Sequence, residues 1–275
     1  MQQVVDSQWL HEHLATVKVL DAGIVKPGLP GPYKAEAVIP GALRFDISHA
    51  LSAADSDLPN SCCSAAQFQA EMRQLGINNE DVLVAYDDKG MFSAARAWYM
   101  LKAMGHKRVY VLDGGLPAWQ RCGFDVTQSY AQTTAVGNFT ANSNVVGFVD
   151  KQAVIENLAS EKATVLDARG ASRFAGIGDE PREDMRSGHI PKSLNLPYTE
   201  LLDEQGLFKP KAELSKLFAA RVAELSQPLI FSCGSGVTAC ILALVAHELG
   251  YQQVSVYDGS WSEWGSDPNV AVEQS

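Results

Sequence analysis

The sequence repeats itself once, at a spacing of about 146 residues. Four short motifs of the first half return in the same order in the second half. One residue from each motif marks the pairs: Asp21 and Asp167, Ile39 and Ile190, Asp87 and Cys233, Asp113 and Asp258. The spacing is 145 to 151 residues for all four pairs. Solenoid repeats have periods of only about 20 to 50 residues, so this chain of 275 residues is predicted to contain a duplicated domain.

The region between the repeats predicts the domain boundaries. Residues 126–149 carry no charged side chain and are rich in Thr, Ser, Asn and Gln, which is typical of an extended linker. We therefore expect a first domain over residues 1–125 and a second domain over residues 150–275.

Both halves alternate short β-branched runs with longer helical patterns. This alternation is typical of an α/β fold in which a parallel sheet is covered by helices on both faces. The second half is predicted to contain helices over 151–158, 211–222 and 237–249, and strands over 164–166, 229–232 and 254–257. The helix over 237–249 is apolar nearly all round, so we expect it to be buried.

The composition disfavours several classes of protein. The 32 acidic and 22 basic residues give a net charge of −10, which disfavours binding to nucleic acid or to an anionic membrane surface. The longest apolar stretch, over 237–246, is about half of the ~20 residues that a membrane-spanning helix needs. The first residues do not resemble a signal peptide, so a cytoplasmic location is expected. The five cysteines include no C-x-x-C motif, so free thiols are expected.

The segment after the strand over 229–232 is the candidate for chemistry. It begins with Cys233, Gly234, Ser235 and Gly236 and leads into the predicted helix. Glycines let backbone N–H groups turn inward, and a helix N-terminus adds positive potential, so an anion at the centre of such a loop is stabilised. The same field lowers the pKa of a thiol. The alternative is a buried structural cysteine before a tight turn.

A cysteine in such a loop is found in more than one class of enzyme. Phosphatases of the C-x5-R type hold the phosphate with an arginine at the end of the loop. Ala239 occupies that position here. The sequence therefore disfavours a phosphatase.

Over essentially its whole length, the sequence resembles the tandem-domain rhodanese family of sulfurtransferases. The motifs that carry the resemblance are the doubled domain, Asp21-Ala22, Asp167-Ala168-Arg169, Gly188-His189-Ile190-Pro191 and the loop CGSGVTA that begins at Cys233. Relatives that prefer thiosulfate typically carry basic residues after the cysteine. Gly234 and Ser235 are neutral, as in relatives of the 3-mercaptopyruvate type. In this family only the second domain is catalytic, and Asp87 stands where the first domain would need the cysteine.

The resemblance implies two rhodanese-like domains and a sulfur-transfer reaction at Cys233. The Cys233 thiolate would attack the sulfur of 3-mercaptopyruvate, leaving a persulfide on Cys233 and releasing pyruvate. Backbone N–H groups of the loop would hold the persulfide. The residues of this cradle are Gly234, Ser235, Gly236, Val237 and Thr238. A thiol, or cyanide, would then accept the sulfur. Thioredoxin is the acceptor that the resemblance suggests, and no cofactor or metal is expected.

Two arginines match the family residues that grip the substrate. Arg173 and Arg182 would bind the carboxylate and the ketone of mercaptopyruvate, because a guanidinium donates a fork of hydrogen bonds and keeps its charge. The alternative is that both are surface arginines paired with neighbouring acidic residues.

The sequence departs from the family pattern in the first domain. Ser235 matches a loop serine that is proposed to act with a histidine and an acid of the first domain. Alignment places Ser48 at the position of the acid and Asn60 at that of the histidine. His49 is adjacent to the first of these and is the candidate substitute.

Two other functions stay open at this point. One is a thiosulfate sulfurtransferase, which an assay with both donors would distinguish. The other is a persulfide carrier or binding module with little turnover, which the missing histidine and acid keep in consideration.

Expectations for the remaining residues concern packing. Four tryptophans are expected in the core or at the domain interface: Trp98, Trp119, Trp261 and Trp264. Phe92 resembles a family aromatic that faces the cleft. Cys122 and Cys240 are expected to be buried, and Cys62-Cys63 is expected to be an ordinary loop rather than a redox switch.

Overall fold

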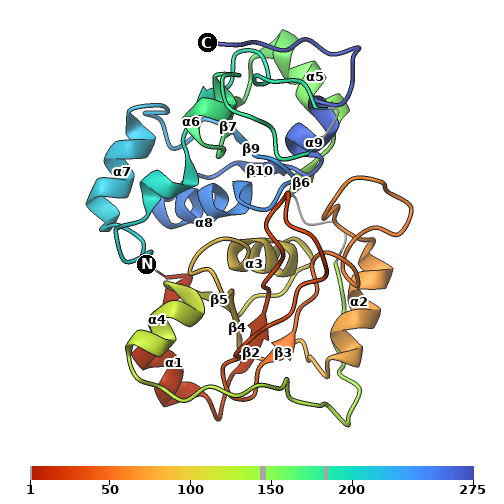
Figure 1. The fold of residues 1–275 in the computed structure, drawn as a ribbon, viewed down its shortest axis with the longest axis vertical. Coiled ribbons are helices and arrows are strands. Elements are labelled where there is room, and N and C mark those ends of the chain that lie inside the picture. The colour runs from red at the N-terminus through yellow and green to blue at the C-terminus, as the bar shows by residue number, and fades with distance from the viewer. Residues whose placement is uncertain (1, 143–146, 183–184) are drawn as a thin grey trace.

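The computed structural model describes residues 2–142, 147–182 and 185–275. Within these ranges the chain forms two lobes, each built around one sheet (Figure 1). The elements of the first lobe are β1 (Val4–Val5), α1 (Ser7–His13), β2 (Lys18–Asp21), β3 (Leu43–Arg44), α2 (Ala65–Gln74), β4 (Leu83–Tyr86), α3 (Ala94–Ala103), β5 (Val109–Leu112) and α4 (Gly115–Arg121).

The second lobe contains a matching set of strands. Its elements are β6 (Phe148–Val149), α5 (Lys151–Ser160), β7 (Thr164–Asp167), α6 (Ala171–Phe174), β8 (Leu194–Asn195), the 3-10 helix η1 (Tyr198–Leu201), α7 (Lys211–Ala219), β9 (Leu229–Ser232), α8 (Ala239–Leu249), β10 (Val254–Tyr257) and α9 (Ser260–Trp264).

The two sheets have the same topology. The strand order is β1-β5-β4-β2-β3 in the first and β6-β10-β9-β7-β8 in the second, and every pair is parallel. Asp21 pairs with Tyr86 in the first sheet, and Asp167 pairs with Ser232 at the equivalent place in the second. The α/β duplication predicted from the repeat is confirmed.

Helices cover both faces of each sheet. In the first lobe α2 and α3 pack on one face and α1 and α4 on the other, because alternate strand residues such as Val19 and Leu20 join different hydrophobic clusters. In the second lobe α7 and α8 cover one face and α5 and α9 the other. The α3 and α8 sides of the two sheets belong to one continuous core, and these two helices lie side by side between the lobes (Figure 1).

The connection between the lobes runs along the first one. Thr127 forms an antiparallel bridge with Val38, and the N–H of Gly137 donates to the carbonyl of Arg73 at 2.8 Å. A Cβ at Gly137 would lie only 2.0 Å from the carbonyl oxygen of Ile77, so this close approach requires glycine. Phe139 is buried beside Phe68. The chain from 126 to 142 is therefore extended and packed on the first lobe.

Most predicted elements are present, with differences at helix ends. Asp150 caps α5 by accepting the N–H of Ala153 at 2.9 Å. The helix predicted over 211–222 ends at Ala219, after which the chain continues as turns. The helix predicted from 237 begins at Ala239, because Val237 and Thr238 belong to the preceding turn.

The packing predictions are confirmed except at one cysteine. The four tryptophans and Cys240 are buried. Cys122 is exposed, because it follows the short helix α4 on the side facing solvent, so the prediction of a buried side chain was wrong. Cys62 and Cys63 are free thiols in a loop, and burial raises their pKa to about 12 and about 11.

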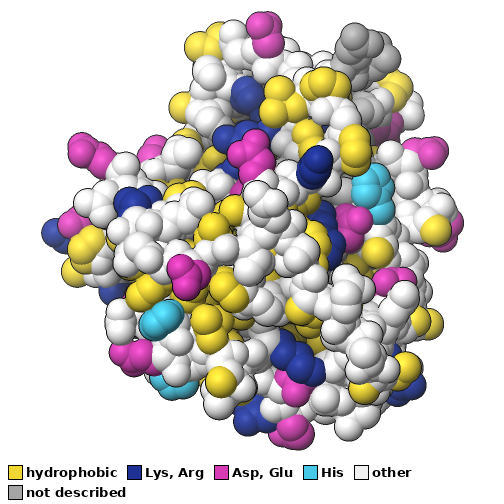
Figure 2. Space-filling view, turned by 60° about the horizontal axis from the view of Figure 1, so that its bottom comes forward, with side chains coloured by type: hydrophobic (Ala, Val, Ile, Leu, Met, Phe, Trp, Pro, Cys, Tyr) yellow, Lys and Arg dark blue, Asp and Glu magenta, His cyan; other side chains and the backbone are white. Residues whose placement is uncertain are grey.

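The surface carries charges of both signs. On the face shown in Figure 2 acidic and basic side chains lie interspersed among apolar ones. Among the described residues the longest helix, α8, has 11 residues, and none is long and apolar enough to cross a membrane.

Candidate active site

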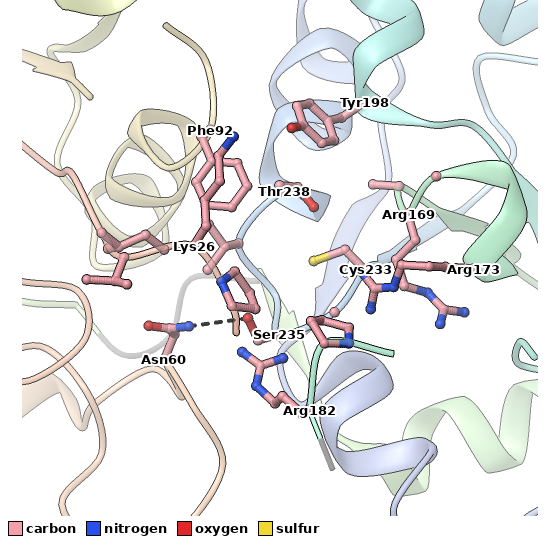
Figure 3. Close-up of a pocket in the computed structure, with 18 of the residues that line it drawn as sticks. Lys26, Asn60, Phe92, Arg169, Arg173, Arg182, Tyr198, Cys233, Ser235 and Thr238 are labelled. Carbon is pink, nitrogen blue, oxygen red and sulfur yellow. Dashed lines mark hydrogen bonds between the residues drawn. The ribbon is translucent and has the colours of Figure 1, made fainter. Parts of the chain in front are cut away.

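A cavity of about 340 Å³ lies between the two lobes, at the carboxyl end of β9. Figure 3 shows residues of the first lobe on one side, arginines of the second lobe on the other, and Cys233 and Ser235 between them. The polar, charged and aromatic residues that line it are Lys26, Asn60, Phe92, Arg169, Arg173, Asp179, Arg182, Tyr198, Cys233, Ser235 and Thr238. The site residues expected from the sequence therefore meet at one place, and only Gly236 lies behind the lining.

Cys233 is the first residue after β9, and its thiol points into the cavity (Figure 3). Only 1% of the residue is exposed to solvent. A sulfur held here is shielded from water, which strengthens its interactions with nearby dipoles and charges. The thiol is therefore reached only through the cavity.

The loop after Cys233 presents four unpaired N–H groups. The backbone N–H groups of Gly234, Ser235, Val237 and Thr238 donate no hydrogen bond to any residue that the structure describes. Unpaired buried N–H groups are rare and need an acceptor from outside the protein. Together with the start of α8, they make the loop a site for an anion.

The carbonyl groups of the same loop are held on its outer side. The carbonyl of Cys233 accepts the N–H of Trp261 at 3.0 Å, and that of Gly234 accepts the N–H and the hydroxyl of Ser262. The carbonyl of Gly236 accepts Arg96 Nη1 at 3.2 Å. The peptides of this loop, like all those the structure describes, are trans, so each N–H points away from its anchored carbonyl and toward the loop centre.

Two serines that sequence reasoning missed complete the loop. The hydroxyl of Ser260 donates to Tyr257 and accepts the N–H groups of Cys233 and Gly236, each at 3.1 Å. These two N–H groups therefore do not face the sulfur. The hydroxyl of Ser262 accepts Arg182 Nη1 at 3.1 Å. A hint was available, since both serines lie in the motif that repeats at Asp113 and Asp258.

The two predicted arginines lie above Gly234. A Cβ at Gly234 would be 3.6 Å from Arg173 Nη2 and 3.9 Å from Arg182 Nη1. The missing side chain leaves room for both guanidinium groups beside the loop. Arg173 also pairs with Glu180 at 2.5 Å, whereas its buried Nε has no partner among the described residues. Burial lowers the pKa of Arg182, although the group stays charged near neutral pH.

A buried ion network supports Arg173 from behind. Arg169 pairs with Asp167 at 2.8 Å and with Glu180 at 2.9 Å, and it stacks over the ring of Trp261. Glu180 thus joins Arg169 to Arg173 and fixes both side chains. This network neutralises Arg169, whereas Arg182 has no acidic partner within 4.0 Å in the described chain. Sequence analysis did not assign a role to Arg169 or Glu180.

The three aligned polar residues form one hydrogen-bonded chain. The hydroxyl of Ser48 donates to Asn60 Oδ1 at 2.9 Å, and Asn60 Nδ2 donates to the hydroxyl of Ser235 at 3.2 Å (Figure 3). Ser235 therefore accepts from Asn60, and its own proton is directed elsewhere. An amide has no basic nitrogen, so this chain cannot take a proton from the serine. His49 is exposed and does not line the cavity.

Three further residues lie in the cavity, outside it or in the equivalent loop of the first lobe. Phe92 lines the cavity and lies edge-on to Tyr198, with the ammonium of Lys26 5.5 Å from its ring centre. Arg186 lies outside the site, where it donates to four backbone carbonyl groups near the end of α9. The side chain of Asp87 is completely buried in the first lobe.

Two stretches of the chain match a known domain family. The model of the Rhodanese-like domain matches the chain twice, over residues 6–122 and 150–267. The chain belongs to the rhodanese family. Each family match contains four of the five strands of its sheet, with β1 and β6 lying just before the matched ranges, and the two matches place Asp87 and Cys233 in corresponding loops.

Relatives that match nearly the whole of this chain carry the names of sulfurtransferases. A 3-mercaptopyruvate sulfurtransferase of Escherichia coli is 39% identical, with 98% of this chain and 97% of the relative covered. A mitochondrial thiosulfate/3-mercaptopyruvate sulfurtransferase of Arabidopsis thaliana is 37% identical, with 99% and 78% covered. The crystal structure of SseA from Escherichia coli, a 3-mercaptopyruvate sulfotransferase, superposes with a TM-score of 0.84 at 37% identity and covers 94% of this chain and 98% of that one. The resemblance read from the sequence is confirmed.

Proposed function

We propose that the protein transfers sulfur from 3-mercaptopyruvate to a thiol through a persulfide on Cys233. The observation that carries this proposal is the loop with four unpaired N–H groups around a thiol, placed beside Arg173 and Arg182. The names of the relatives agree with it. The enzyme class is a transferase of sulfur-containing groups.

The first half-reaction follows from this arrangement. The Cys233 thiolate attacks the sulfur of mercaptopyruvate, and an S–S bond forms as the C–S bond breaks. The electron pair of the broken bond passes into the enolate of pyruvate, which then takes a proton on carbon. Arg173 and Arg182 are placed to hold the carboxylate and the keto oxygen, where the enolate charge develops. The Cys233 persulfide is left in the cradle.

The second half-reaction returns the thiol to its first state. An acceptor thiolate attacks the outer sulfur of the persulfide and carries it away, while the Cys233 thiolate leaves. Cyanide would take the same sulfur. Thioredoxin is the proposed protein acceptor. A cytoplasmic location is proposed with it, because all five cysteines are free and a reducing compartment keeps them so.

Ser235 has a limited part in this scheme. Because its hydroxyl accepts from Asn60, the proton of Ser235 is available to the substrate or the persulfide. We propose that Ser235 donates one hydrogen bond to the sulfur-transfer site and does not act as a proton relay. Formation of the thiolate then rests on the loop N–H groups and the start of α8.

The test is the intact mass of the protein after incubation with 3-mercaptopyruvate, together with assay of released pyruvate. One added sulfur atom is expected, and Cys233→Ser is the control that should show neither the added mass nor pyruvate. The same measurement with thiosulfate tests the alternative donor. Steady turnover with a small thiol distinguishes an enzyme from a persulfide carrier. Added sulfur on Cys233→Ser would overturn the assignment of the nucleophile.

A further inference from the structure

An arginine of the first lobe reaches into the loop of the second. Arg96, in α3, is completely buried at the interface between the lobes. Its Nη2 donates to Asp258 Oδ1 at 2.6 Å and to the carbonyl of Asn60 at 2.7 Å, and its Nη1 donates to the carbonyl of Gly236 at 3.2 Å. One guanidinium thus contacts both the cradle and the residue that binds Ser235.

The repeat shows that this arginine has no counterpart. The spacing of 145 residues that relates Asp113 to Asp258 also relates Arg96 to Ile241. Ile241 is buried in α8 but carries no charge. The lobe with Asp87 therefore supplies an arginine to the lobe with Cys233, and receives none in return. If Arg96 only joined two similar lobes, we would expect an arginine at the equivalent position of the second lobe as well.

The contact with Gly236 acts on the next peptide N–H. The carbonyl of Gly236 and the N–H of Val237 belong to one trans peptide and point in opposite directions. Holding the carbonyl on the outer side therefore aims the N–H of Val237 at the sulfur. A charged donor on the carbonyl also polarises the peptide, which makes its N–H a stronger donor.

The surrounding charges leave this effect intact. Asp258 binds Nη2, so the positive end of the ion pair at Nη1 faces the loop. The thiols of Cys62 and Cys240 lie near Arg96, and burial raises the pKa of each to about 12, so both are neutral at pH 7. The Cys240 thiol also donates to the carbonyl of Gly236 at 3.2 Å, so Arg96 supplies the charged donor of two. No acidic side chain of the described residues other than Asp258 pairs with Arg96 within 4.0 Å.

We propose that Arg96 is a positioning residue for sulfur transfer, which fixes and polarises the Gly236–Val237 peptide so that its N–H stabilises negative charge on the sulfur of Cys233. The inference rests on the proposed function, in which Cys233 is the nucleophile. It gives the first domain, which lacks a cysteine of its own in the matching loop, a direct part in the chemistry of the second.

The test compares Arg96→Met and Arg96→Lys with the wild type by two readouts. The first is the pKa of the Cys233 thiol, from the pH dependence of alkylation by iodoacetamide, followed by peptide mass mapping because Cys122 is exposed. The second is the rate of persulfide formation with mercaptopyruvate. We expect Arg96→Met to raise the thiol pKa and to slow persulfide formation by roughly 10²-fold, the loss typical of one anion-stabilising donor, with little change in KM.

Arg96→Lys should show an intermediate effect. Its ammonium keeps the charge but is drawn to Asp258 and leaves the carbonyl of Gly236. The titratable or charged groups near Cys233 are the same in both variants, so a shift in the thiol pKa reports on position 96. These groups are Lys26, Arg169, Arg173, Asp179, Arg182, Tyr198 and Cys240.

Arg186→Met is the matched control, because Arg186 also binds several backbone carbonyls but lies outside the site. It should lower the melting temperature without moving the thiol pKa. The same result for Arg96→Met would overturn the proposal and leave Arg96 as an interface contact. If Arg96→Met does not fold, Arg96→Lys decides: an unchanged thiol pKa and rate overturn the proposal. A wild type that forms no persulfide with mercaptopyruvate would refute the donor, while the thiol pKa still tests Arg96.

Discussion

The loops after β4 and β9 occupy equivalent places in the two lobes but begin with different residues, Asp87 and Cys233. In both, the carbonyl of the first residue accepts an N–H from a later helix, Leu116 for Asp87 and Trp261 for Cys233. In the first loop the carboxylate of Asp87 accepts four backbone N–H groups at 2.8 to 2.9 Å. In the second loop the equivalent inward N–H groups have no partner among the described residues.

This difference shows how one loop design gives two outcomes. The first loop is filled by its own side chain, so it contributes stability and offers nothing to a ligand. The second loop carries a thiol, which places a reactive sulfur at the same point and leaves the N–H groups for the charge that sulfur develops. A single side chain therefore decides between a structural loop and a site.

The largest effect is expected when the second loop is made like the first. In Cys233→Asp the carboxylate should accept the open N–H groups, as Asp87 does, and sulfur transfer should be lost completely. Intact mass and pyruvate release measure this loss. Because the new hydrogen bonds stabilise the fold, the melting temperature should not fall. A marked fall would show that the two loops are less alike than their geometry indicates.

The next largest effect concerns Arg173 and Arg182, the two arginines that lie beside the second loop. Arg182→Met should lower kcat/KM for mercaptopyruvate. The loss in transition-state binding free energy should be about 2 to 5 kcal/mol, the range seen when a buried charge loses its partner. Steady-state kinetics at saturating acceptor measure this effect. The thiol of Cys233 should still react with iodoacetamide. Unchanged kinetics would mean that the substrate does not lie against this arginine.

The first loop should respond in stability rather than activity. Asp87→Asn removes the charge that four N–H groups bind, which should lower the free energy of unfolding by about 1.5 to 3 kcal/mol. Urea denaturation measures this change. Persulfide formation on Cys233 should be retained in the folded variant. A loss of activity without loss of stability would contradict the division between the loops.

Asp113 and Asp258 occupy equivalent places in the two lobes, and their surroundings also differ. Asp258 binds Arg96, whereas Asp113 accepts only the N–H of Phe208 from the other lobe, and burial raises its pKa to about 6. The folded state therefore holds the Asp113 proton more tightly than the unfolded state. Ionisation of Asp113 costs stability, which falls as pH rises from about 4 through 6. Asp113→Asn should gain about 1 to 2 kcal/mol at pH 7.5 and nothing at pH 4, as thermal unfolding at both pH values would show.

The smallest effect is expected for Ser235. Ser235→Ala should cost about 0.5 to 1.5 kcal/mol in the rate of persulfide formation, the value of one ordinary hydrogen bond. Because Asn60 has no basic nitrogen, the rate should follow one ionisation, that of the thiol, without a second limb near pH ~6.5 from a histidine. His49→Ala should change nothing. A large loss in that variant, with the fold intact, would show that His49 acts after all.

Much of the fold was predictable because its signals are local or repeated. The repeat at Asp21 and Asp167 predicted the duplication, and alternating patterns predicted strands such as Leu229–Ser232 to the residue. Errors arose where a helix ends, as at Ala219, or where exposure depends on what lies opposite, as for Cys122. Neither the end of a helix nor the exposure of a single side chain can be predicted from a hydrophobic period of two or 3.6 residues.

The site was predictable only where a motif names it. The loop from Cys233 was found from its glycines and the predicted start of a helix, whereas the two arginines were found because the family places that residue type at those positions. Arg96, Ser260 and Ser262 were missed, since each binds backbone groups of the loop, and any suitable donor or acceptor in the right place would do so. Such contacts leave no pattern in a single sequence.

The sequence by itself determined the doubled α/β architecture, the nucleophile candidate and the asparagine at the position of the family histidine. These depend on residue identity and on local periodicity. Only the tertiary structure decided which N–H groups of the loop are open, that His49 lies away from the cavity, and that Arg96 crosses between the lobes to Gly236. Those facts depend on the directions of peptide groups and on contacts between residues up to 140 positions apart, which form only when the two lobes pack together.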